Sequence, residues 1–170
     1  MPAQPMQYQP GQPAMVGAPG ALVPPGMHWF LVLVLGTVTF GIFTIIWVFK
    51  QANFVQRIDP SNPARKLFTI MILLLVVYVA IVAGAVVAQS TEAVATVGAI
   101  GGLVDLGMAA LSLIAIFKMR TSLLNYYNSV EPIGLRLSGV MTFFFNIYYF
   151  QYHFHRIAQW KQTGMLVPQR

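Results

Sequence analysis

Long apolar runs alternate with short polar stretches along most of this chain. Three runs, over residues 27–49, 66–89 and 94–117, are long enough for membrane-spanning helices, which need about 20 apolar residues. A fourth run, 137–150, is shorter and leads into an aromatic-rich stretch. Runs of about 10–14 residues are typical of re-entrant or interfacial segments. The pattern therefore predicts an all-α integral membrane helical bundle, with three transmembrane helices and a fourth, re-entrant or interfacial aromatic helix.

The Lys and Arg residues are unevenly distributed between the loops that these helices would leave. Loop 50–66 holds four of them, the link 90–93 none and loop 118–136 three. Because cytoplasmic loops of membrane proteins are enriched in Lys and Arg, we predict that loops 50–66 and 118–136 are cytoplasmic and that the uncharged N-terminal tail lies outside. A fourth full span over 137–157 would place the three basic residues of the C-terminal tail outside, against that rule. Four full spans is therefore the alternative architecture.

The composition favours the same class and narrows the expected partners. The chain is 57% hydrophobic and only 8% charged, whereas soluble domains average about 25% charged residues. Its formal net charge of +6 comes from short basic groups beside apolar runs, which suit anionic lipid headgroups. Nucleic acid would need a basic face on a folded soluble domain. We expect the lipid bilayer as a partner, with further copies of the chain or other membrane proteins, and no nucleic acid.

Three regions follow from the pattern. Residues 1–26 are rich in Pro, Gln, Gly and Met and carry no charge, so we expect a disordered tail. Residues 27–164 form the predicted membrane helical domain, and 165–170 a short tail. The first charged residue is Lys50, so the basic start of a cleavable signal peptide is missing.

Asp105 lies at the centre of the third apolar run. An acid at the middle of a spanning helix costs about 2.5–3.5 kcal/mol on insertion scales, so it is expected to face other helices and to have a polar partner. Valines lie opposite it across the tight hairpin of the second and third spans. Thr37 and Thr39 in the first run lie at the same depth, as does Asn146 if the fourth segment enters the membrane. We predict a midplane polar cluster of these four residues.

Small residues form stripes on the second and third predicted spans. Small residues four apart allow helices to approach closely. The stripes are predicted helix-packing surfaces, with Gly98 opposite Gly84 and Gly102 opposite Ala80, and they also suit self-association. Their members are Ala80, Gly84, Ala88, Gly98 and Gly102.

The middle of the first run is unusual for a straight span. It contains Gly36, Thr37, Thr39 and Gly41, which permit either a close helix contact or a local break. The pattern Gly36-x-x-Thr39-Phe40-x-Ile42 is echoed by Gly139-x-x-Thr142-Phe143-x-Phe145.

The same stretches carry a family resemblance. Residues 39–47, TFGIFTIIW, resemble the T-x-G-[IF]-[YF]-x-x-x-W box of a bacterial domain-of-unknown-function family of small integral membrane proteins. Residues 137–145 and 149–153 resemble the C-terminal part of some of its members. The resemblance implies a multi-pass protein of the bacterial cytoplasmic membrane with three or four helices. It supplies no catalytic residue or ligand.

The sequence offers no constellation for catalysis. There is no cysteine, and no motif pairs a nucleophile with a base or cradles a phosphate. His153 and His155 are two residues apart, so on a helix they point to different sides and would not share a metal ion. We expect no catalytic residue, cofactor or metal, and a structural or interaction component of the membrane rather than an enzyme. The alternative is a small oligomeric channel or transporter with Asp105 at its site.

Overall fold

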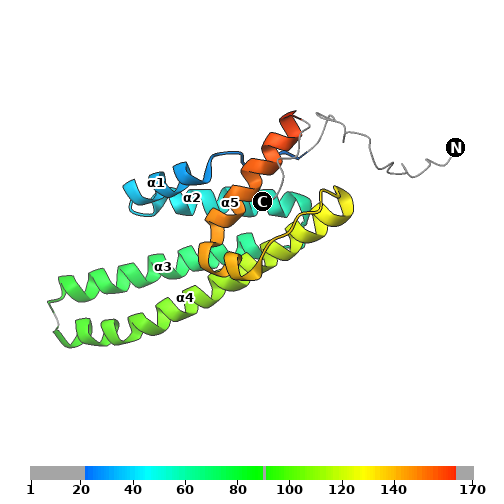
Figure 1. The fold of residues 1–170 in the computed structure, drawn as a ribbon. Coiled ribbons are helices and arrows are strands. Elements are labelled where there is room, and N and C mark those ends of the chain that lie inside the picture. Colours follow the sequence, from blue (N-terminus) through cyan, green and yellow to red (C-terminus); the bar gives the residue numbers. More distant parts are fainter. Residues whose placement is uncertain (1–21, 90, 164–170) are drawn as a thin grey trace.

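The computed structural model describes residues 22–89 and 91–163, and every regular element within them is a helix (Figure 1). The all-α prediction is confirmed for these residues, while most of the predicted N-terminal tail and the 165–170 tail lie outside them. The helices are α1 (Trp29–Val38), α2 (Ile42–Ile58), α3 (Ala64–Val87), α4 (Thr91–Asn125) with a π-helical turn η1 (Tyr126–Val130), and α5 (Gly139–Thr163).

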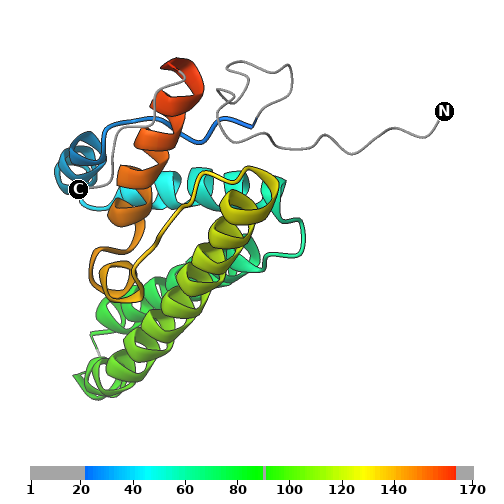
Figure 2. The ribbon, with the colours of Figure 1, turned by 45° about the vertical axis from the view of Figure 1, so that its right-hand side comes forward.

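Helices α3 and α4 form a long antiparallel hairpin, seen from two sides in Figures 1 and 2. These two helices are the ones long and apolar enough to cross a membrane by length and composition. They correspond to the second and third predicted spans and their tight link. Among the described residues of 69–89 and 91–114, only Gly101 is buried inside the chain. We refer to residues 69–89 and 91–114 as the hairpin arms.

The first predicted span is broken in the middle, so residues 27–49 do not form one continuous helix and the local break that the sequence left open is present. Helix α1 ends at Thr39, and Phe40 and Gly41 follow with φ angles of 49° and 91°. Phe40 N donates to Thr37 O (3.1 Å) and Gly41 N to Gly36 O (2.7 Å), the pairing that ends many helices on a left-handed residue. Thr39 Oγ1 then accepts from Phe43 N (2.9 Å) and caps α2. The freed backbone groups are satisfied locally, which is why the chain can turn back here.

Helix α5 is also interrupted. Asn146 has φ 52° and ψ −124°, which no helix interior adopts. The kink divides the fourth predicted segment into a short arm, residues 139–145, and a long arm, residues 147–163. The short arm is apolar, whereas the long arm carries Arg156 and Lys161.

The hydrophobic core lies at the end of the molecule away from the α3–α4 link. It joins α2, the first turns of α3, the last turns of α4, the connection after η1 and the long arm of α5. We call this part the head and define it as residues 47–68, 115–137 and 147–163. Its fully enclosed side chains include Val55, Met119, Tyr127, Phe150 and Phe154. The structure is therefore a packed head with an apolar hairpin that extends beyond the core.

Candidate functional site

The four residues of the predicted midplane cluster are not brought together within the chain. Asp105 is exposed on α4. Thr37 and Thr39 donate from Oγ1 to Leu33 O (2.9 Å) and Leu35 O (2.7 Å) of their own helix. Among the described residues no hydrogen bond joins Asp105 to either threonine or to the amide of the α5 kink. The reason is the break after α1, which packs this short helix against α2 and α5 instead of α4.

The amide of the α5 kink, Asn146, is the fourth member of that prediction. Its Oδ1 is buried and accepts no hydrogen bond within the part of the chain that the structure describes. It lies on the wall of a cavity of about 260 Å³ between α2, α3, α4 and α5, together with Thr44, Ser112 and Tyr148.

The small-residue stripes lie on the outside of the hairpin. A Cβ added at Gly84, Gly98 or Gly102 would meet no atom within 4 Å, and Ala80 and Ala88 are exposed. The predicted facing pairs therefore do not form within the chain. The hairpin uses a different glycine for its close contact, because Gly101 lies under the Tyr78 hydroxyl, where a Cβ would overlap it. Gly101 is thus on the side of α4 that faces α3, and the stripe around Gly98 and Gly102 is left uncovered.

A buried glutamine network joins three parts of the chain. Gln51 and Gln151 are both 0% exposed. Gln151 Oε1 accepts from Trp47 Nε1 (2.7 Å) and from Gln51 Nε2 (3.0 Å). Gln151 Nε2 donates to Pro25 O (2.8 Å) and Met27 O. Because buried polar groups are normally paired, this one amide fixes the N-terminal segment, residues 22–28, against α2 and α5.

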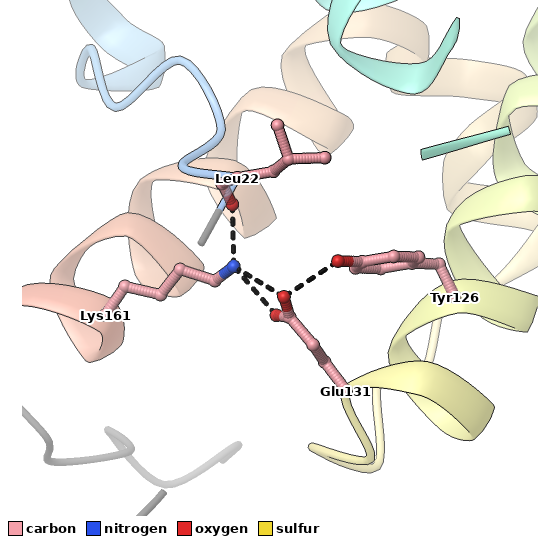
Figure 3. A network of polar contacts seen from close by, with 4 residues as sticks. All are labelled: Leu22, Tyr126, Glu131 and Lys161. Carbon is pink, nitrogen blue, oxygen red and sulfur yellow. Dashed lines mark hydrogen bonds and ion pairs between the residues drawn. The ribbon is translucent and has the colours of Figure 1, made fainter. Parts of the chain in front are cut away.

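A second network fastens the same segment to the end of α4 (Figure 3). Lys161 Nζ lies 2.8–2.9 Å from the Glu131 carboxylate oxygens and donates to Leu22 O (2.6 Å). Tyr126 OH donates to Glu131 Oε1 (2.8 Å). The Lys161 and Glu131 side chains are only 8% and 22% exposed, so the pair is largely shielded from water. His155 Nδ1 lies 2.7 Å from a further carbonyl, that of Gly26.

These contacts correct one topological expectation. The N-terminal segment and loop 118–136 were predicted to lie on opposite sides of the membrane. The shared Lys161 contact places Leu22 beside Glu131, so both lie at the head end of the molecule.

A third polar group joins the connection between α2 and α3 to α4. Ser122 Oγ donates to Asp59 Oδ2 (2.5 Å) and accepts from Asn62 Nδ2 (2.8 Å). Ser61 Oγ also donates to the carboxylate (2.6 Å). The hydrogen bond from Ser122, followed by that from Ser61, lowers the pKa of Asp59 below its ordinary value.

The histidines do not converge on a ligand. Among the described residues no group of three or more metal-ligating side chains is found. The His153 ring is buried against the Tyr149 ring, with centroids 4.7 Å apart, whereas His155 faces the N-terminal segment. Burial, reinforced by the charge of Arg156, lowers the pKa of His153 to about 4, so this ring is neutral near pH 7. The arrangement serves packing and carries no nucleophile beside a base.

Comparisons with protein-family models, with curated proteins and with solved structures found no match. The family resemblance of residues 39–47 therefore stays a prediction.

Proposed function

We propose that this chain is an integral membrane protein whose α3–α4 hairpin crosses the bilayer while the head stays at one surface. The observation that carries the proposal is the exposure of the hairpin arms. Leu73, Val87 and Leu103 are 60%, 82% and 72% exposed, and no core of the chain covers them. At 1.5 Å per residue each arm is ~30 Å long or slightly more, which matches the hydrocarbon thickness of a bilayer. Lipid is the solvent that such a surface requires.

The distribution of charge supports one orientation. Every Lys and Arg of the described residues belongs to the head, and the hairpin link carries only Glu92. Basic residues collect on the cytoplasmic side of membrane proteins and attract anionic headgroups. The head, with the N-terminal segment and the end of α5, is therefore proposed to lie in the cytoplasm. The bacterial cytoplasmic membrane is proposed from the resemblance alone.

We further propose a non-enzymatic structural or interaction role, with contacts between copies of the chain along the hairpin arms. The open stripe that includes Gly84, Gly98 and Gly102 allows close approach of another helix. Asp105 adjoins this stripe, and an intramembrane acid is unfavourable unless another group pairs with it. The Asp105 of a second copy would supply a polar group at the same depth in the membrane.

The membrane topology is tested with single cysteines, which the cysteine-free chain makes unambiguous. Gln89→Cys marks the α3–α4 link, while Ser129→Cys and Ser61→Cys mark the head. In sealed membrane vesicles a membrane-impermeant maleimide should label Gln89→Cys from one side and both head positions from the other. The proposal fails if alkaline carbonate extracts the protein, or if all three positions are labelled from the same side.

The second candidate function is a small oligomeric channel or transporter, favoured by the exposed acid at Asp105. Cross-linking of Gly98→Cys, with Leu103→Cys on the opposite side of α4 as the matched control, tests self-association. Ion flux into proteoliposomes is then compared between the wild type and Asp105→Asn. Cross-linking at Gly98 without flux supports the structural role, whereas a flux that the substitution abolishes replaces it with the channel.

A further inference from the structure

The α1–α2 hairpin is too short to cross a bilayer, yet its tip is strongly apolar. Helix α1 has 10 residues, which is ~15 Å or about half of the hydrocarbon thickness. At its tip Phe40 is 98% exposed, and Val38 and Ile42 are exposed on either side of it. Figure 1 shows that this tip points the same way as the α3–α4 link but stops short of it. The hairpin therefore fits within one leaflet.

The short arm of α5 is a second exposed apolar segment. Arg120 holds its start, because Nε and Nη2 donate to Leu137 O at 2.9 and 2.6 Å. The following residues expose apolar side chains, including Phe143 and Phe144, before the kink at Asn146 turns the chain back into the head. An arginine at the start and aromatic side chains beyond it suit a segment that enters from the headgroup level and returns.

On the proposed membrane topology, the two leaflets contain different amounts of protein. The leaflet next to the head holds α1, the start of α2, the short arm of α5 and both hairpin arms. The far leaflet holds the two hairpin arms alone. We infer that the protein is a one-sided membrane wedge that prefers, and at high density promotes, convex curvature of the leaflet next to its head.

The partner in this inference is an anionic lipid bilayer. Lys50, Lys118 and Arg120 lie in the head close to where the inserted segments begin, and Lys50 lies over the Trp47 ring, 5.0 Å from its centroid. Basic and aromatic residues of this kind hold a protein at the headgroup level. They fix the depth of α1 and of the α5 short arm, so extra area is added to one leaflet. Insertion on one side of a bilayer is sensitive to curvature for this reason.

The test measures how the full-length protein sorts between vesicles of different size. Gln162→Cys, at an exposed position, carries a fluorescent label, and the protein is reconstituted into zwitterionic and anionic phospholipid vesicles covering a range of diameters. A membrane-impermeant quencher separates molecules with the head outside from those with the head inside. Head-out molecules should be several-fold denser per unit area on the smallest vesicles than on the largest. Head-in molecules should show the opposite trend, because their leaflet is concave.

Two double variants test whether the inserted segments cause the dependence on vesicle size. Val38→Lys with Ile42→Lys places two charges at the α1–α2 tip and should remove the dependence on vesicle size. Gln56→Lys with Thr121→Lys adds the same charge to the head and should leave it unchanged. Equal wild-type density on all vesicles, or full size dependence in the tip variant, overturns the inference. Loss of carbonate-resistant insertion would instead overturn the proposed membrane topology, so the two failures are distinguishable.

Discussion

Replacing Gln151 by leucine should destabilise the head more than any other single change in its polar networks. The side chain has four hydrogen bonds, two accepted by Oε1 and two donated by Nε2. Leucine is of similar volume, so the change leaves little cavity and acts mainly on these bonds. It removes all four at a site with no access to water.

The magnitude follows from the groups left behind. Losing a typical hydrogen bond costs about 1 kcal/mol, and leaving a buried donor without a partner costs about 1–3 kcal/mol. The Trp47 indole N–H, whose residue is 4% exposed, loses its partner, as do the carbonyls of Pro25 and Met27. The expected loss in the free energy of unfolding is about 3–5 kcal/mol, or on the order of 10 °C in melting temperature for a chain of this size.

The assay is thermal unfolding in mild detergent, followed by the fluorescence of Trp47 after Trp29 and Trp160 have been replaced by phenylalanine. Gln162→Leu makes the same chemical change at an exposed position of the same helix and is the matched control. Limited proteolysis supplies a second readout, because cleavage within residues 22–28 should accelerate in Gln151→Leu alone. A melting temperature within about 2 °C of the control would refute the reasoning, since that corresponds to less than about 1 kcal/mol.

Three further predictions concern other parts of the head and the α1–α2 turn. Ser122→Ala should lower the free energy of unfolding, measured with denaturant, by about 1–3 kcal/mol, because the Asp59 carboxylate loses a buried hydrogen-bond donor. The free energy of unfolding should fall by about 2 kcal/mol from about pH 7.5 to about pH 5. Over this range the unfolded chain binds a proton on His153, whereas the folded chain does not, because its His153 has a pKa of about 4. His153→Gln should flatten this dependence on pH. Gly36→Ala should cost about 1–3 kcal/mol and lower the melting temperature, because its Cβ overlaps Thr44 Oγ1; unchanged melting would contradict the tight α1–α2 contact.

The long apolar helices were predictable because their signal is local. A run of some twenty Leu, Ile, Val and Ala residues has few alternatives to a helix, so α3 and α4 follow from the pattern of residues 66–117. The break after α1 was foreseen only as an option. The same glycines and threonines suit a straight packed helix and a turn, and the choice depends on whether Gly36 can lie against α2 in the folded chain.

The polar networks depend on contacts between distant residues, which periodicity does not report. Gln51 and Gln151 are a hundred positions apart, and only their position among aromatic and apolar neighbours hinted at burial. Glu131 lies in the predicted loop 118–136 and Lys161 follows the fourth apolar run, so no local pattern indicated that the two would pair. Asp105 stands out in the sequence as a charge within an apolar run, but its exposure on α4 depends on how α3 and α4 pack together, which the sequence alone does not determine.

The hydrogen bonds that hold the N-terminal segment have a consequence for the order in which the protein folds during translation. Gln151, His155 and Lys161 bind this segment through its backbone carbonyls, so none of those bonds depends on a side-chain polar group of residues 22–27. All three holding residues lie on α5, which the ribosome makes after the other described helices. At about 5–20 residues per second the ribosome needs roughly 7–27 s to travel from residue 28 to residue 161. The hairpin arms are complete only once residue 114 has been made, which leaves roughly 2–9 s of that interval at the same rate. The first segment has none of these partners until α5 has been made, so α5 closes the head after the hairpin arms are complete.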